Sequence, residues 1–200
     1  GTTPGVNYDQ LAVTGTVSLG NAALALSVGY SPIMGDTYII ISNDALDAVT
    51  GTFANLAEGA TFAVGTNAFS ITYAGGTGND VVLTNIPCTA PSASDPANQT
   101  VCVGATATFN TTASGVGPLT YQWRKGMMAL MDGGNIAGAT TSTLMISNAS
   151  AGDAGSYDVV VTGGCAPPFT TAAATLTIGD TTAPTVTAPT TATVTQTLCQ

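Results

Sequence analysis

The sequence predicts an all-β protein of two domains, and three observations point to that class. Apolar and polar residues alternate through much of the chain, and a period of two is typical of half-buried strands. The 36 threonines favour strands, while 24 glycines and 10 prolines break the chain at short intervals. No stretch has a helical repeat of useful length. With 44% hydrophobic residues, the chain can build packed cores.

In the first predicted domain, residues 1–86, strands are expected where this alternation is clearest, at 11–19 and 24–28. Residues 38–41 are apolar on both faces, which indicates a fully buried strand. Shorter strands are expected around Phe53, Phe62, 69–73 and 81–83.

In the second predicted domain, residues 87–179, six strands follow one another with turn residues between them. This even spacing is typical of a β-sandwich. The expected strands are 99–103, 106–112, 119–124, 142–147, 155–162 and 171–178.

Charge and composition exclude several classes of function. Lys and Arg total 2 against 11 Asp and Glu, a net charge of −9, so the chain has no basic surface for nucleic acid or an anionic membrane. It contains no His, which removes the commonest general base and the commonest metal ligand. No run reaches the ~18 apolar residues of a membrane helix. We therefore expect neither an enzyme nor a membrane-inserted protein.

Four cysteines without any Cys-x-x-Cys spacing argue for disulfides rather than zinc. Disulfides persist in oxidising compartments. The sequence therefore predicts an extracellular or cell-surface location.

Residues 8–15, 29–37, 49–53 and 73–84 of the first domain resemble the terminal unit of bacterial autotransporter-associated β-strand repeat proteins. The most specific part is the ending GGTGNDVVLT, residues 75–84. The resemblance implies a β-helix- or β-roll-like terminal unit that closes a repetitive passenger region.

The Gly-rich run before Asp80 also has the composition of calcium-binding β-roll nonapeptides, but those sites need neighbouring copies and this chain has one. A plain turn with Asp80 capping the loop is the favoured interpretation. The acidic loop of Asn43, Asp44 and Asp47 is interpreted in the same way. We therefore expect no cofactor, and calcium is the alternative.

In the second domain, Trp123 in the run Tyr-Gln-Trp-Arg-Lys, followed by Asp153-Ala-Gly-Ser-Tyr157, resembles the immunoglobulin-like fold. The resemblance implies that Trp123 is a core residue rather than a sugar-stacking platform. It implies that Tyr157 forms a tyrosine corner and that Asp153 is the turn residue before its strand. Met127, Met128 and Met131 follow the cations; we expect them in an irregular loop over the sandwich rather than on an adaptable binding surface.

The usual inter-sheet cysteines of that fold are replaced here by Thr111 and Val159. Bacterial immunoglobulin-like repeats carry an alternative pair, which implies a Cys102–Cys165 disulfide. Cys88 and Cys199 then remain, and a head-to-tail contact between molecules would let them pair.

The last segment, residues 180–200, is a Thr/Pro-rich linker. It has two interpretations: the first strand of another repeat, or a donor strand that adds to a sheet edge of a neighbouring molecule. The absence of charged side chains from 181 to 200 supports donation, because edge strands that stay single usually carry charge.

Together these features predict a bacterial extracellular protein with a structural or adhesive task, and a filament subunit if its strands pair between molecules. The expected partners are further copies or neighbouring surface proteins. The alternative is an accessory, carbohydrate-binding module of a larger secreted hydrolase, with polysaccharide as its partner. Exposed aromatic side chains in a row would favour that alternative, and buried aromatics would favour the structural function.

Overall fold

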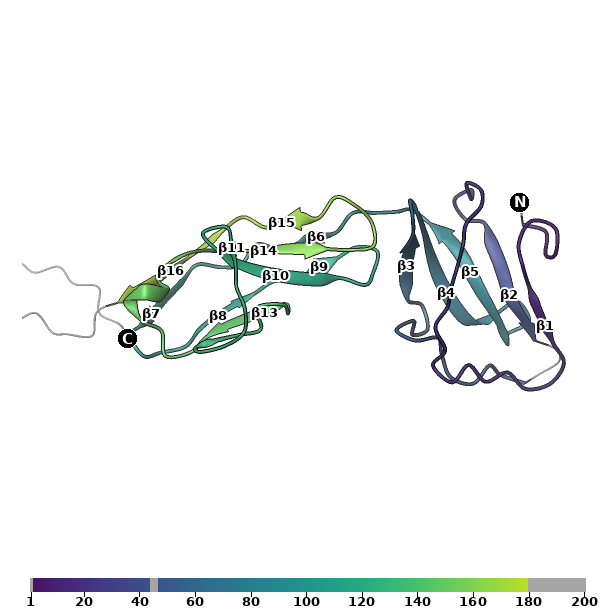
Figure 1. The fold of residues 1–200 in the computed structure, drawn as a ribbon, viewed down its shortest axis with the longest axis horizontal. Helices are drawn as coiled ribbons and strands as arrows, with labels where there is room; N and C mark the ends of the chain where they lie inside the picture. The colour runs from purple at the N-terminus through teal and green to yellow at the C-terminus, as the bar shows by residue number, and fades with distance from the viewer. Residues whose placement is uncertain (1, 44–46, 180–200) are drawn as a thin grey trace, which may run out of the picture. The chain divides into compact units, whose positions relative to one another are not determined.

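Two compact units make up the chain in the computed structural model, which describes residues 2–43 and 47–179 (Figure 1). The first unit comprises Gly1–Pro91 together with the loops Gly115–Leu119 and Gly163–Pro167. The second, called the sandwich unit below, comprises Ser92–Ser114, Thr120–Thr162 and the described chain from Pro168. Every regular element is a strand apart from one short 3-10 turn, so the predicted all-β class is confirmed.

The first unit is built on one five-stranded sheet in the order β1-β2-β5-β4-β3. Its strands are β1 (Leu11–Val13), β2 (Thr37–Asn43), β3 (Thr61–Val64), β4 (Asn67–Gly75) and β5 (Asp80–Ile86). Alternate residues of the central strands point into a core formed by Tyr38, Phe69, Ile71, Val81 and Leu83, all 8% exposed or less.

The strand directions in this sheet differ from those of the expected β-helix- or β-roll-like unit. A β-helix stacks parallel strands from successive turns, whereas the β2–β5, β5–β4 and β4–β3 pairs are antiparallel. In this sheet the parallel strand pair is β1 with β2, at one edge. Parallel bridges in the same unit join Ser18 to Thr50 and Pro4 to Tyr8. Short turns join β3 to β4 and β4 to β5, and such turns produce antiparallel pairs.

The sandwich unit contains the remaining strands, in two main layers (Figure 1). One sheet has the order β11-β10-β14-β16-β7 with β15 on β14, the other has the order β12-β13-β8, and β6 pairs with β9. The strands are β6 (Ser92–Ala93), β7 (Gln99–Cys102), β8 (Ala107–Asn110), β9 (Ala113–Ser114), β10 (Thr120–Lys125), β11 (Met128–Ala129), β12 (Ile136–Ala137), β13 (Thr143–Ile146), β14 (Gly155–Thr162), β15 (Phe169–Thr170) and β16 (Ala174–Gly179). The 3-10 turn η1 (Ala151–Asp153) precedes β14.

Trp123 lies at the centre of the sandwich core and is fully buried. Its indole Nε1 donates a hydrogen bond to the Thr141 carbonyl at 2.8 Å. Its ring packs on Phe109, which in turn stacks on Tyr157 with ring centroids 5.1 Å apart. The Tyr157 hydroxyl donates to the Asp153 carbonyl at 2.6 Å, so both aromatic side chains keep their polar atoms bonded while their rings are buried.

The positions that usually carry the inter-sheet disulfide are buried here without cysteine: Thr111 is 4% exposed and Val159 is fully buried. On the sheet surface, Arg124 and Asp158 lie opposite each other on β10 and β14 and form two hydrogen bonds of 2.7 and 2.9 Å.

The structure corrects the expected disulfide pairing, because Cys165 is bonded to Cys88 with a Cα–Cα distance of 5.6 Å. Leu176 of β16 faces Gly155, the first residue of β14, and Cys102 faces Gly179, which is further along β16. Cys102 therefore lies at the end of the sheet where β14 begins. Cys165 follows the last residue of the same eight-residue strand. A strand of that length spans roughly 26 Å, far more than a disulfide can bridge.

The same bond corrects the expected contact between Cys88 and Cys199, because Cys88 is already paired within the chain. Cys102 is disulfide-bonded as well. Cys199 and the rest of residues 180–200 lie outside the described residues.

Asp153 makes the stability of the sandwich unit depend on pH. Its carboxylate accepts hydrogen bonds from the Ser150 backbone, the Ser150 hydroxyl and the Asn135 amide. Burial alone would raise the pKa of Asp153, but these bonds and the charge of Lys125 lower it below the ordinary value of 3.8.

Because the folded pKa is lower than the unfolded one, this stabilisation is present above about pH 4 and is lost as the pH falls through the folded pKa. At low pH we expect the loss of this interaction to lower the free energy of unfolding of the sandwich unit by about 1 kcal/mol. Urea unfolding between pH 6 and pH 2.5 measures this change. In Asp153→Asn the unfolding midpoint should fall less over that range. An equal decrease in both proteins would contradict the assignment.

Candidate binding groove

A single extended segment, residues 23–30, crosses the inner face of the first unit's sheet (Figure 1). Its side chains alternate as the sequence predicts. Leu24, Leu26 and Val28 are half-buried and pack on the core, whereas Ala25 and Ser27 are exposed. The segment thus has the side-chain pattern of a strand.

The backbone of this segment lacks the pairing that a strand normally has. Within the described chain, residues 23–29 form no backbone–backbone hydrogen bond. The predicted strand 24–28 is therefore extended but unpaired, and the predicted strand 11–19 is limited to β1. Native proteins pair nearly all backbone groups that are shielded from water, so an edge of this kind is a template for another strand.

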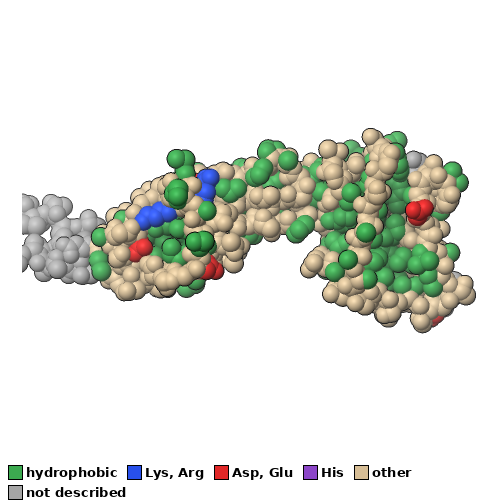
Figure 2. All heavy atoms as spheres, viewed as in Figure 1, with side chains coloured by type: hydrophobic (Ala, Val, Ile, Leu, Met, Phe, Trp, Pro, Cys, Tyr) green, Lys and Arg blue, Asp and Glu red, His purple; other side chains and the backbone are tan. Residues whose placement is uncertain are grey.

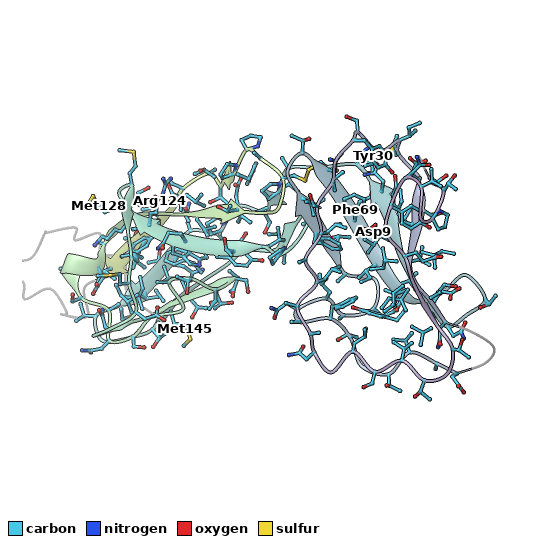
Figure 3. All side chains as sticks on the ribbon, turned by 45° about the vertical axis from the view of Figure 1, so that its right-hand side comes forward. Asp9, Tyr30, Phe69, Arg124, Met128 and Met145 are labelled. Carbon is cyan, nitrogen blue, oxygen red and sulfur yellow. A yellow bond between two sulfur atoms is a disulfide. The ribbon has the colours of Figure 1, made fainter. Side chains whose placement is uncertain are left out.

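A groove of about 630 Å³ lies between this segment and the N-terminal residues 5–9. Its floor is formed by sheet residues, and its walls are residues 5–9 and 24–30. Figure 2 shows hydrophobic side chains gathered on this part of the first unit. Figure 3 shows Asp9, Tyr30 and Phe69 in the same region, and all three line the groove. Val6, also in the lining, is 77% exposed.

Tyrosine side chains make part of the groove rigid. Tyr38 forms edge-on ring contacts with Tyr8, Tyr30 and Phe69 at centroid distances of 5.3, 6.4 and 6.3 Å. The Tyr30 hydroxyl donates to the Tyr38 hydroxyl at 2.6 Å, and the Tyr38 hydroxyl donates to Asp36 at 3.1 Å. Burial, and then these two hydrogen bonds, raise the pKa of Tyr38. Tyr38 is therefore a neutral hydrogen-bonding group in the groove.

The chemistry of the groove suits binding. Asp9 is the one charged side chain in its lining, and the lining contains no Cys, Lys or Arg. Among the described residues, no group of three His, Cys, Asp or Glu side chains is placed to hold a metal ion. Apolar walls and an unpaired backbone are the features of a surface that takes an extended polypeptide.

A second exposed apolar surface lies at the end of the sandwich unit. Met127, Met128 and Met131 are between 74% and 83% exposed, and Met128 projects from the β10–β11 hairpin (Figure 3). The expected loop folded over the sandwich is thus an exposed hairpin end. Met127 has a φ of 69° in the turn.

Comparison with known proteins identifies the sandwich unit. Residues 92–178 match the family model described as immunoglobulin I-set domain, so this part of the chain is an immunoglobulin-like domain, as predicted. The match leaves residues 1–91 outside it. The search of curated proteins found no match to the chain.

Solved structures similar to the chain include an I-band fragment of titin, with 24% identity over 46% of this chain and a TM-score of 0.41. The chain covers 33% of that fragment. A complex of titin M10 with an obscurin-like 1 immunoglobulin domain is 26% identical over 48% of this chain and 99% of the other, with a TM-score of 0.42. The N-terminal Ig1-2 module of the Drosophila receptor protein tyrosine phosphatase DLAR is 31% identical over 45% of this chain and 49% of that chain, with a TM-score of 0.40.

Immunoglobulin-like domains typically have structural or adhesive tasks and commonly contact other proteins. In the described part of the chain, no helix is long and apolar enough to cross a membrane.

Proposed function

We propose that this chain is a structural or adhesive protein of the bacterial cell surface whose copies associate by strand pairing. The observation that carries this proposal is the unpaired extended segment 23–29 beside an apolar groove. The resemblance of residues 1–86 to the terminal unit of autotransporter-associated repeats supports the bacterial surface. The Cys88–Cys165 disulfide supports an oxidising compartment.

The occupant that fits the groove is a strand from the tail of a second copy, residues 190–198. In the sequence of this segment, Ala192, Val194 and Leu198 alternate with threonines, so a strand would present one apolar face. The tail from 181 to 200 carries no charged side chain, and the groove contains a single one. Nine residues extend roughly 30 Å, enough to follow the seven residues 24–30.

The burial of the aromatic side chains favours this function over a carbohydrate-binding module. Among the described residues, the exposed large hydrophobic side chains are aliphatic or Met, and none is aromatic. The row of exposed aromatic side chains that would favour the carbohydrate-binding alternative is thus not seen among these residues. Trp123 in particular is buried, which leaves no indole face for a sugar ring.

Sedimentation velocity at increasing concentration, with electron microscopy of the same samples, tests the proposal. We expect concentration-dependent association of the full chain, weakened at least tenfold by Val6→Asp in the groove, because the new charge would be buried by an incoming strand. Met34→Asp is the matched control, because Met34 is 70% exposed and lies outside the groove lining. A full chain that stays monomeric at millimolar concentration would refute strand pairing.

Two substitutions in the proposed donor strand, residues 190–198, form a second test and its control. Val194→Asp should abolish association, whereas Thr193→Asp, on the opposite face of the expected strand, should weaken it far less. Deleting residues 181–198 should have the effect of Val194→Asp while Cys199 stays in place. Association that survives both changes would show that the copies meet elsewhere.

A further inference from the structure

The two polar loops that the sequence presented as separate turns meet at one end of the first unit's sheet. Asn43 is the last residue of β2 and Asp80 is the first residue of β5. The Asn43 backbone N–H donates to Asp80 Oδ1 at 2.8 Å, and the Thr77 N–H donates to Asp80 Oδ2 at 3.1 Å. The Gly-rich loop after β4 is thereby closed around the Asp80 carboxylate, at the point where β2 ends.

Gly76 shows how closely the loop surrounds this carboxylate. It has a φ of +54°, and a Cβ atom there would lie within 1.8 Å of Asp80 Oδ2. The backbone therefore approaches the carboxylate at a distance that only glycine permits.

Asp80 is a buried acid without a cationic partner. It is 4% exposed, and both of its oxygens accept backbone N–H donors. Residues 1–91 contain neither Lys nor Arg. The cations of the chain are engaged in the sandwich unit, where Arg124 bonds Asp158 and Lys125 donates to the Gly152 carbonyl. Buried charges are ordinarily paired with an opposite charge or bound to a metal ion.

Asn43, whose backbone N–H donates to this carboxylate, also has a buried side-chain amide. Asn43 is 4% exposed, and its Nδ2 donates to the Asp47 carbonyl at 2.5 Å. That bond fixes the amide orientation, so the opposite atom is Oδ1. Among the described residues, Asn43 Oδ1 is buried and accepts no hydrogen bond. A buried acceptor of this kind is rare and calls for an unseen donor or cation.

We propose that the junction of β2 with the loop before β5 binds a calcium ion through the Asp80 carboxylate and Asn43 Oδ1. Hard oxygen ligands that combine a carboxylate with an amide carbonyl are typical of Ca²⁺, and the chain offers no His for a softer metal. The ion supplies the positive charge that residues 1–91 lack.

Isothermal titration of the EDTA-treated full chain with CaCl₂ tests this site. We expect one site with a Kd of about 10⁻⁴–10⁻³ M, the range of extracellular modules with few carboxylates. The unfolding temperature of the first unit should rise with Ca²⁺ and return with EDTA. In hydrogen exchange, the amides of Asn43 and Thr77 should gain protection.

Asp80→Asn removes the carboxylate and is the direct test of the site. If that variant does not fold, two substitutions of Asn43 with opposite expected effects on the Kd still test it. Asn43→Leu should raise the Kd at least tenfold, because it removes the amide oxygen. Asn43→Asp should lower the Kd about tenfold while lowering the unfolding temperature in EDTA, because a second buried carboxylate repels the first. Asp9→Asn, which removes an exposed acid of the same unit, should leave the Kd unchanged.

Two results would overturn the site: no heat and no rise in unfolding temperature up to 10 mM CaCl₂, or an unchanged Kd in both Asn43 variants. Neither result bears on strand pairing, because the groove lining includes neither Asn43 nor Asp80.

Discussion

Trp123→Ala is expected to lower the free energy of unfolding of the immunoglobulin-like domain by about 3–5 kcal/mol. The indole is fully buried and packs on Phe109, which stacks on Tyr157. Alanine would leave a cavity next to both rings, and it would leave the Thr141 carbonyl without the indole donor. Denaturant unfolding followed by far-UV circular dichroism measures the loss.

Trp123→Phe is the matched control, because it keeps an aromatic ring and removes the N–H donor. We expect it to cost less than the alanine variant, since most of the contact area stays buried. Equal losses in the two variants would assign the effect to the hydrogen bond rather than to packing. A loss below about 1 kcal/mol for alanine would contradict the position of Trp123 at the centre of the core.

The parts of this domain that could be predicted from the sequence are those encoded by short local patterns. Trp123 in its strand and the run from Asp153 to Tyr157 each lie within a few residues, and their roles depend on a single strand or turn. The family match over residues 92–178 confirms the immunoglobulin-like fold. The alternation at residues 24–28 likewise gave the inward-facing side chains correctly.

Pairing partners could not be predicted, because they depend on contacts between distant residues. Alternation shows which side of a strand is buried but not whether its backbone meets another strand, so the unpaired state of residues 23–29 was missed. For the same reason the contact between Asn43 and Asp80 was not predicted. These residues are 37 positions apart and meet only because β2 pairs with β5. The absence of Lys and Arg from residues 1–91 is visible in the sequence. The burial of Asp80 is not, so the sequence alone does not identify Asp80 as a buried acid without a counter-charge.

The cysteine assignment failed for a related reason. The resemblance placed Cys102 and Cys165 on either side of the sandwich strands, yet linear order does not say at which end of β14 each one lies. The structure places Cys165 in the loop Gly163–Pro167, which belongs to the first unit. There it joins the buried cluster of Ala68 and Val116, and Cys88 follows β5 in the same unit.

Removing the Cys88–Cys165 bond is therefore expected to destabilise the first unit strongly. The bond closes a loop with a sequence separation of 77 residues, and its loss should cost about 2–5 kcal/mol because the unfolded chain gains freedom. The double variant Cys88→Ala/Cys165→Ala, unfolded without reductant, measures this loss. Substitution is a cleaner test than reduction, since Cys102 is disulfide-bonded too and a reductant would break both bonds.

Peptide mapping of the non-reduced protein identifies the bond independently of stability. The peptide containing Cys88 should be recovered linked to the one containing Cys165, and recovery of Cys102 with Cys165 would restore the sequence-based pairing. Val116→Ala is the control for packing alone, because Val116 touches Cys165 in the same cluster. Removing two methyl groups there should cost less than losing the bond, because the chain-entropy contribution of the cross-link is retained. Equal losses would mean that the cluster, and not the covalent bond, stabilises this part of the first unit.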